Sequence, residues 1–172
     1  MSTDNNSNII LIGMPTSGKS TIGVILAKIL GYRFIDSDIV IQEKESRKLS
    51  KIIEEDGVDG FIQIENRINS EITADRTVIA TGGSVVYGKE AMEHYRNIGR
   101  IIYLKVSFST LKRRLHHARQ RGVVMREGQT LKSLYDERTK LYEKYADITV
   151  DEGNDSLEGV IERICSLLSV NL

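Results

Sequence analysis

Residues 13–20, GMPTSGKS, have the types and the spacing of a loop that binds the phosphates of a nucleotide. The glycines let the backbone turn tightly, so that successive N–H groups point at one anion. Lys19 supplies a mobile positive charge for the β- and γ-phosphates, and the Ser20 hydroxyl is a suitable Mg²⁺ ligand. A glycine-rich turn with an accidental lysine is the structural alternative, and the match favours nucleotide binding. The residues predicted to bind the nucleotide are Gly13, Pro15, Thr16, Ser17, Gly18, Lys19, Ser20 and Thr21.

Two aspartates, Asp36 and Asp38, follow a predicted strand and suit the two other needs of phosphoryl transfer. In an open α/β sheet, ligands bind at the carboxyl ends of the strands, where these residues stand. Asp36 would act on Mg²⁺ through water, and Asp38 would accept a hydrogen bond from the acceptor hydroxyl and act as its base. The structural alternative is that Asp36 or Ser37 only caps the next helix.

A glycine pair, Gly82 and Gly83, follows another predicted strand and is expected at the same edge of the sheet. Glycine at such a place lets the backbone approach a ligand closely and offers bare N–H groups to it. A tight turn with no ligand explains the pair equally well.

The helix predicted over residues 129–145 carries an arginine on its apolar stripe. Counting from Leu131, apolar side chains fall at offsets 0, 3, 4, 10, 11 and 14, and Arg138 falls at offset 7. A charge at such a position must be paired or must face a cleft. The sequence leaves two interpretations open, an ion pair with an internal carboxylate or the binding of an anionic substrate group.

A basic run extends from residue 112 to residue 126, and most of its charges are expected on a solvated helix face. Gly122 and Gly128 bracket its end, which predicts a mobile lid near residues 119–128. Such a lid would bring Arg121 over the phosphates, where it would stabilise the charge on the transferred group. The run also holds His116 and His117, which have no partners at metal-ligand spacing, so we assign them no metal.

Short apolar runs alternate with helical stretches along the chain, which places these motifs in an α/β domain. The predicted strands are residues 8–12, 32–35, 77–80, 100–106 and 147–150. Among the helices, one is expected to begin at DGFIQIEN, residues 59–66. The order predicts a mostly parallel sheet in a single domain over residues 8–172, after a disordered polar tail of residues 1–7.

The composition is that of a globular protein with 40% hydrophobic and 28% charged residues and a formal net charge of zero. A general nucleic-acid binder would carry a basic excess, so we expect no nucleic-acid partner. No apolar run approaches the roughly 20 residues that span a bilayer, and the N-terminus lacks an apolar signal segment. The single cysteine, Cys165, excludes an internal disulfide and fits the reducing cytoplasm.

The order of these motifs resembles the shikimate kinase family over nearly the whole chain after the tail. The phosphate loop is shared with many nucleotide hydrolases and kinases. The DSD pair and the R-x-x-L-Y helix, found in the same order, are much more specific. The motifs that carry the resemblance are GMPTSGKST, DSD at residues 36–38, F-x-x-x-E at Phe61 and Glu65, the glycine turn, the arginine-rich run and R-x-x-L-Y at residues 138–142.

The resemblance implies a three-layer P-loop NTPase fold of the nucleoside-monophosphate-kinase type, with a five-stranded parallel sheet flanked by helices. It implies that ATP with Mg²⁺ is the phosphoryl donor and that a hydroxyl of a small polyol acid is the acceptor. Carried over to this chain, the catalytic residues are Lys19, Asp38 and Arg121, the metal is served by Ser20 and Asp36, the adenine by Arg114, and the acceptor by Asp38, Gly82, Gly83 and Arg138.

Three positions depart from the family pattern, and they lie in the acceptor site and the lid. The family's F-R-x-x-E reads FIQIE here, so Ile62 stands in place of the arginine that binds the acceptor carboxylate in the family. The triple glycine begins with Thr81, and the Arg-Pro of the lid reads Arg121-Gly122.

The helical wheel places Ile62 on the flank of an apolar stripe, where it would line the mouth of the cleft. An arginine at that position would pair with Glu65, three residues later. Without that arginine, Glu65 needs another cation or a donor group from the substrate. We therefore add Ile62 and Glu65 to the predicted acceptor-binding residues.

These features predict ATP-dependent phosphoryl transfer to a hydroxyl of a small anionic metabolite, namely shikimate to shikimate 3-phosphate. One alternative is a related kinase for a different hydroxylated metabolite, and another is a nucleotide-binding module without catalysis. We expect a small-molecule acceptor as the partner, no nucleic acid, no membrane, and a monomer.

Overall fold

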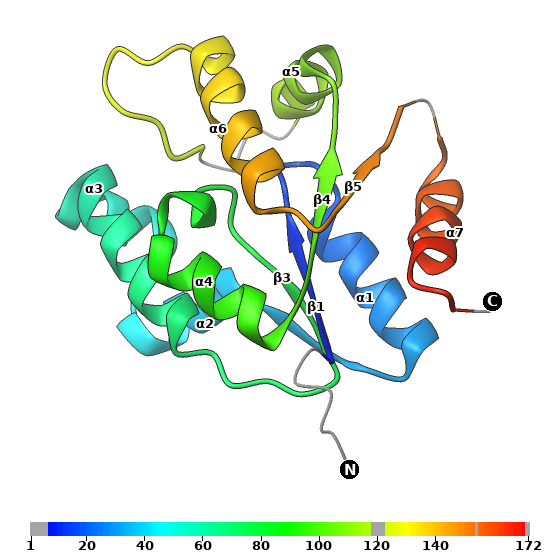
Figure 1. The fold of residues 1–172 in the computed structure, drawn as a ribbon. Coiled ribbons are helices and arrows are strands. Elements are labelled where there is room, and N and C mark those ends of the chain that lie inside the picture. Colours follow the sequence, from blue (N-terminus) through cyan, green and yellow to red (C-terminus); the bar gives the residue numbers. More distant parts are fainter. Residues whose placement is uncertain (1–6, 118–122, 154, 171–172) are drawn as a thin grey trace.

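The computed structural model describes residues 7–117, 123–153 and 155–170. Within them, a parallel five-stranded sheet lies between two layers of helices (Figure 1). The strand order across the sheet is β2-β3-β1-β4-β5. The strands are β1 (Asn8–Ile12), β2 (Arg33–Asp36), β3 (Thr77–Ala80), β4 (Gly99–Lys105) and β5 (Ile148–Asp151). The helices are α1 (Lys19–Leu30), α2 (Ser37–Glu45), α3 (Leu49–Ser70), the short 3₁₀ helix η1 (Val85–Tyr87), α4 (Lys89–Ile98), α5 (Phe108–His117), α6 (Leu131–Tyr145) and α7 (Leu157–Leu167).

All five predicted strands are present. Those predicted at residues 8–12 and 77–80 have the predicted ends, and the other three are shifted by one residue. Every pairing between neighbouring strands is parallel, as the alternation of strands and helices predicts. The fold is therefore the P-loop kinase fold that the motif order implies.

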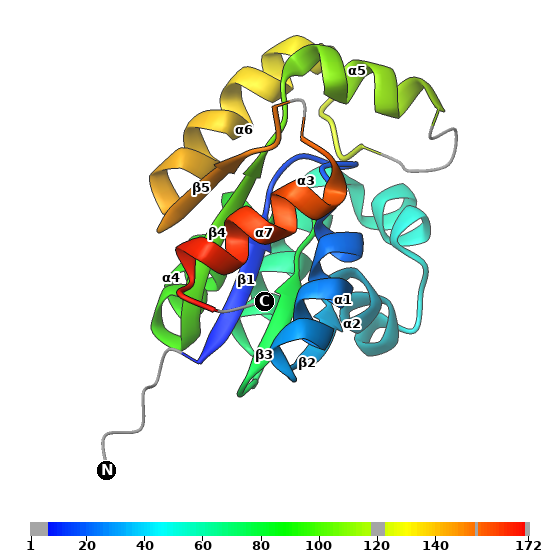
Figure 2. The same ribbon diagram turned by 90° about the vertical axis from the view of Figure 1, so that its right-hand side faces the viewer.

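The central strand β1 is buried on both faces, and its side chains alternate between two cores. Ile9 and Leu11 pack with residues of α1 and α7, whereas Ile10 and Ile12 pack with residues of α4 and α6. Figure 2 looks onto the layer formed by α1 and α7. Cys165 is fully buried in this layer.

A third core lies between α2 and α3 and includes Phe61 and Ile68. Helix α3 begins at Leu49 and is interrupted at Gly57, where φ is 73° and ψ is 177°. The helix predicted to begin at residues 59–66 corresponds to the second half of α3, which resumes after Gly57, whereas the half before Gly57 was not predicted. The first half escapes a pattern analysis because the kink breaks the 3.6-residue period of the apolar stripe.

The described residues include no helix that is both long and apolar enough to cross a membrane.

Candidate active site

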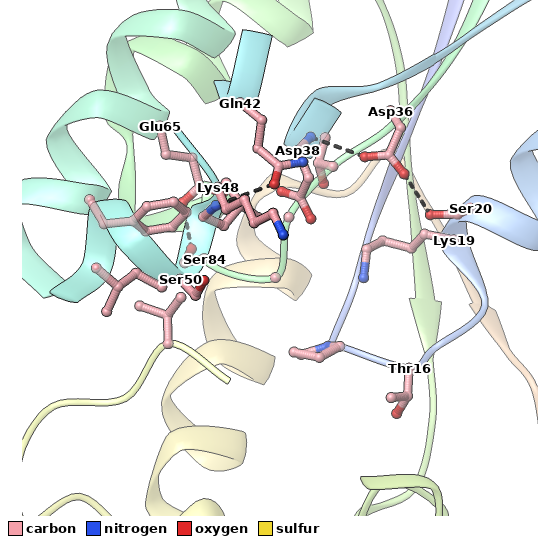
Figure 3. A pocket seen from close by; sticks show the side chains of 18 of the residues that line it. Thr16, Lys19, Ser20, Asp36, Asp38, Gln42, Lys48, Ser50, Glu65 and Ser84 are labelled. Carbon is pink, nitrogen blue, oxygen red and sulfur yellow. Dashed lines mark hydrogen bonds between the residues drawn. The ribbon is translucent and has the colours of Figure 1, made fainter. Parts of the chain in front are cut away.

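A cavity of about 470 Å³ opens where the loops after β1, β2 and β3 meet (Figure 3). Its walls come from the phosphate loop, the first turn of α1, the start of α2, both halves of α3, the turn after β3, and α6. This is the sheet edge at which open α/β folds bind their ligands. The predicted nucleotide and acceptor motifs therefore face one shared space.

The phosphate loop between β1 and α1 has strained backbone angles that its sequence permits. Gly13 and Gly18 have φ values of 151° and 88°, and Thr16 has a φ of 65°. A Cβ atom at Gly13 would lie only 2.7 Å from the carbonyl oxygen of Leu104 in β4. Glycine is thus required there by both the backbone conformation and the neighbouring strand. The loop leads into the start of α1, where a helix offers backbone N–H groups to an anion.

Lys19 is buried, and its ammonium group lies within this loop. Nζ donates hydrogen bonds of 2.8 Å to the carbonyl oxygens of Gly13 and Met14, and a longer one of 3.5 Å to Ser17 Oγ. Lys19 also lines the cavity, together with Pro15, Thr16, Gly18, Ser20 and Thr21. The loop therefore places a positive charge at the wall of the cavity.

Asp36 connects the phosphate loop with α2 through its two carboxylate oxygens. Oδ2 accepts a hydrogen bond of 2.9 Å from the Ser20 hydroxyl, and Oδ1 accepts one of 3.0 Å from the backbone N–H of Asp38. Asp36 is the N-cap of α2, so the helix cap and the contact with Ser20 exist together. Asp38 follows in the first turn of α2 and lines the cavity (Figure 3).

The pair of Ser20 and Asp36 supplies oxygen donors of the kind that Mg²⁺ prefers. No group of three or more His, Cys, Asp or Glu side chains in the described part of the chain is arranged to hold a metal. The pair therefore fits a cation that takes its remaining ligands from nucleotide phosphates and water.

Gly82 and Gly83 are crowded by side chains that line the cavity. A Cβ atom at Gly82 would lie 2.5 Å from Glu65 Oε1 and 2.8 Å from Asp38 Oδ1. At Gly83 it would lie 2.8 Å from Cδ of Pro15 and 3.1 Å from Nη1 of Arg138. The glycine turn after β3 thus lies against acidic, basic and loop residues of the same cavity.

Glu65 lies in the second half of α3 and is 1% exposed. The Ser84 hydroxyl donates a hydrogen bond to Oε2, whereas the buried Oε1 has no hydrogen-bond partner. Burial raises the pKa of Glu65 to about 8, against the lowering effect of the Ser84 hydrogen bond, and the nearby Asp38 raises it further. The carboxyl group is therefore mainly protonated at pH 7. In this form it can be buried without forming an ion pair with a cation.

Arg138 is 1% exposed, and it lies on the buried face of α6, as its helical offset predicts. Nη2 donates to the carbonyl oxygen of Val124, and the guanidinium lies over the ring of Tyr87. Among the described residues, no carboxylate comes within ion-pair distance of Arg138, and its Nε has no hydrogen-bond partner. The structural ion pair that the sequence left open is thus not seen, and the buried cation faces the cavity.

Ile62 and Arg114 are among the predicted site residues that lie outside the cavity lining. Ile62 is half-buried and lies outside the described cavity lining. Arg114 contacts the carbonyl oxygen of Thr16 and forms an ion pair with Glu152, beside the phosphate loop. Arg121 and the glycine that follows it lie outside the described residues.

The structure adds cavity residues that sequence reasoning did not identify, notably Ser84 and Lys48. Ser84 directly follows the glycine pair, so a polar residue next to an approach point for ligands was a usable signal. Lys48 immediately precedes the first half of α3, and it was overlooked because that half-helix was not predicted.

Comparison with known proteins extends this similarity to nearly the whole chain. A family model described as shikimate kinase matches residues 15–169. "Shikimate kinase 2" of Yersinia pseudotuberculosis serotype O:3 (strain YPIII) is 35% identical over 168 residues, 94% of this chain and 95% of that protein. A shikimate kinase of Rippkaea orientalis (strain PCC 8801 / RF-1) is 42% identical over 161 residues, 91% of this chain and 85% of that protein.

A solved structure has the same architecture. The shikimate kinase from Acinetobacter baumannii in complex with shikimate superimposes with a TM-score of 0.85 at 29% identity, covering 94% of this chain and 92% of that chain. The family match, the relatives and the arrangement of the cavity agree, and the protein therefore belongs to the shikimate kinase family.

Proposed function

We propose that the protein transfers the γ-phosphoryl group of ATP to a hydroxyl of shikimate, giving ADP and shikimate 3-phosphate. The observation that carries this proposal is the single cavity shared by a phosphate loop, the Asp36 and Asp38 pair and the buried, carboxylate-free Arg138. Membership of the shikimate kinase family and the shikimate complex of the Acinetobacter baumannii enzyme support the choice of acceptor.

In this proposal Asp38 holds the acceptor. Its carboxylate accepts the hydrogen bond of the reacting hydroxyl and takes the proton as the oxygen attacks the γ-phosphorus. The new O–P bond forms while the bond from the γ-phosphorus to the bridging oxygen of ADP breaks. The contact between Asp36 and the backbone N–H of Asp38 orients this base toward the phosphate loop.

Lys19 and the loop bind the phosphates. Carbonyl oxygens of the loop hold the Lys19 ammonium. The ammonium neutralises negative charge on the β- and γ-phosphates while this charge moves to the leaving group. Ser20 and Asp36 would hold Mg²⁺, which neutralises phosphate charge when it is bound. Arg121 is proposed as a lid residue over the phosphates. Arg114, which hydrogen-bonds the carbonyl oxygen of Thr16 in the phosphate loop, is proposed as the cation next to the adenine.

At the acceptor end, Arg138 pairs with the carboxylate of shikimate. A buried guanidinium without a protein carboxylate gains most from an anionic ligand, since its charge is otherwise poorly compensated. Gly82 and Gly83 let the ring of the acceptor approach the backbone, and Glu65 lies behind that turn. We further propose that the enzyme acts as a monomer in the cytoplasm.

Purified protein with ATP, Mg²⁺ and shikimate should release ADP in a coupled assay, and the phosphorylated product should be detected by mass spectrometry. Omitting shikimate should reduce ADP release to the background of ATP hydrolysis. Thermal stabilisation by MgADP without any shikimate-dependent ADP release would contradict the proposal.

A further inference from the structure

We infer that Lys48 supplies the second positive charge that holds the acceptor carboxylate, acting together with Arg138. The inference rests on the proposed function, because it concerns the acceptor end of the same cavity. Ile62 stands at the position of the family arginine and lies outside the described lining, whereas Lys48 is part of that lining. In Figure 3, Lys48 enters the cavity between Glu65 and Asp38.

The local structure does not explain a lysine at this position. Lys48 is the N-cap of α3, with φ −67° and ψ 150°, and its side chain makes no capping hydrogen bond. N-caps favour Ser, Thr, Asp and Asn, whose side chains accept hydrogen bonds from the helix N–H groups. A lysine has no acceptor atom, and its charge opposes the positive end of the helix dipole. The residue therefore costs helix stability, which favours a role toward an anion outside the helix.

The backbone around Lys48 is held firmly. Its carbonyl oxygen accepts hydrogen bonds from the N–H groups of Lys51 and Ile52, and the N–H of Leu49 donates to Gln42 Oε1. Arg47, the preceding residue, forms ion pairs with carboxylates of α2 and α3, at Glu45, Glu55 and Asp56. The base of the lysine side chain is thus fixed in the wall of the cavity.

The ammonium group of Lys48 has no ion pair within the described part of the chain. It is exposed and reaches the cavity from α3, whereas Arg138 reaches it from α6. Glu65, the buried carboxyl group nearby, is neutral at pH 7 because its pKa is raised, so it does not compensate either cation. An acceptor that brings its own carboxylate completes this charge pattern.

The substitution Lys48→Met tests the inference because it keeps the length of the side chain and removes its charge. We expect the KM for shikimate to rise by about 10- to 100-fold, the usual effect of losing a charge-assisted contact. The KM for ATP and kcat should change little, because Lys48 does not touch the transferred group. Lys48→Arg should keep the KM for shikimate within about threefold, since a lysine contact of this kind needs charge more than geometry.

Two controls separate the charge from other effects. Lys51→Met removes an exposed lysine from the first turn of the same helix, outside the cavity lining, and should leave the KM for shikimate unchanged. Shikimate methyl ester has no negative charge, so Lys48→Met should not weaken its binding further.

A stability measurement distinguishes ligand binding from a structural role. Lys48→Ser introduces a preferred N-cap and should raise Tm by roughly 2–4 °C, while it raises the KM for shikimate like Lys48→Met. A residue that only supported the fold would lower Tm when it is replaced.

The outcomes separate the inference from the proposed function. If the wild-type enzyme phosphorylates shikimate and Lys48→Met leaves the KM for shikimate within about twofold, or raises it equally for the methyl ester, the inference is overturned while the proposed function stands. If the wild-type enzyme does not use shikimate, both are overturned. A rise for shikimate alone, with rescue by Lys48→Arg, supports the inference.

Discussion

Asp36 joins the two halves of the cavity because each of its carboxylate oxygens accepts one hydrogen bond. One oxygen accepts from the Ser20 hydroxyl of the phosphate loop, and the other accepts from the backbone N–H of Asp38. Two hydrogen bonds therefore link the phosphate loop to the backbone of the proposed base. The residue proposed to serve the metal thus also binds the backbone N–H of the residue proposed to hold the acceptor.

The role of Asp38 as the base is tested by Asp38→Asn, which keeps the shape of the side chain and removes its ability to take a proton. We expect kcat to fall by about 100-fold or more, the usual effect of losing a general base. Binding of MgATP, measured by calorimetry, should stay nearly unchanged.

Asp75→Asn is the matched control, because Asp75 lies before β3, at the opposite end of that strand from the cavity, and hydrogen-bonds Ser7. It should keep wild-type kcat. An Asp38→Asn variant that retains more than about a tenth of wild-type kcat would exclude Asp38 as the base.

The site residues that short sequence motifs predict come from the phosphate loop and from the aspartate pair after β2. Lys19, Ser20, Asp36 and Asp38 meet at one cavity, as their spacing predicts. The acceptor end is harder to predict, because its residues come from distant segments and their proximity depends on packing. The hydrogen bond from Ser84 to Glu65 joins residues 19 apart in sequence, and no local pattern predicts it.

At the scale of elements, α3 determines the shape of the acceptor end. Its first half contributes Lys48 at the N-cap, and Ser50 and Ile53 in the helix, whereas its second half contributes Phe61 and Glu65. The two halves meet at a kink, so the angle between them sets the position of the lysine relative to the buried carboxyl group. A straight helix would not present both ends to one cavity in this way.

The kink depends on Gly57, whose φ of 73° and ψ of 177° belong to a region that is essentially restricted to glycine. A Cβ atom there would meet nothing within 4 Å, so the cost of Gly57→Ala is in the backbone alone. We expect the free energy of unfolding to fall by about 1–3 kcal/mol in urea denaturation. The KM for shikimate should rise as well if the halves of α3 reorient.

Gly159→Ala is the control for this prediction, because Gly159 lies within α7 and a Cβ atom there would make only ordinary contacts of 3.5 Å or more. The same substitution should there raise the free energy of unfolding by about 0.5–1 kcal/mol. Similar changes at both positions would show that the kink does not require glycine.

Elements with a strong period are the ones that the sequence predicts. The five strands were found within one residue, since each is a short apolar run between polar turns. The segment from Leu49 to Gly57 was missed because its stripe is short and the kink changes the phase of the pattern. Helix boundaries at kinks depend on backbone conformation, which a pattern of apolar residues does not record.

At the scale of the whole molecule, the strand order brings the motifs together. β3 lies between β1 and β2 in the sheet, although it follows both in the sequence. The phosphate loop, the aspartate pair and the glycine turn therefore end neighbouring strands on one edge. The alternation of strands and helices predicts a parallel sheet, and in a parallel sheet the motifs that follow the strands lie at the same edge.

The burial of Glu65 also affects the stability of the whole molecule. Its pKa is about 8 in the folded protein, chiefly because of burial, whereas the ordinary value is 4.5. Between these values the folded state holds a proton that the unfolded chain has lost. The free energy of unfolding must therefore fall as pH rises through this window, by at most about 1.4 kcal/mol per pH unit from this group. The contribution of neutral Glu65 is complete below pH 4.5 and is lost as pH rises through 8.

Glu65→Gln removes this titration and keeps a polar group next to Ser84. The variant should gain stability relative to the wild type as pH rises from 5 to about 8, and the difference should level off above that, because Glu65 is then ionised in both states. Urea denaturation at each pH unit from about 5 to 9 measures the difference. Glu54→Gln, an exposed position in the first half of the same helix, should follow the wild-type profile.

Parallel profiles for Glu65→Gln and the wild type would mean that Glu65 is ionised in the folded protein. In that case a cation would have to compensate it, and Arg138 and Lys19 are the cations whose charges act on Glu65.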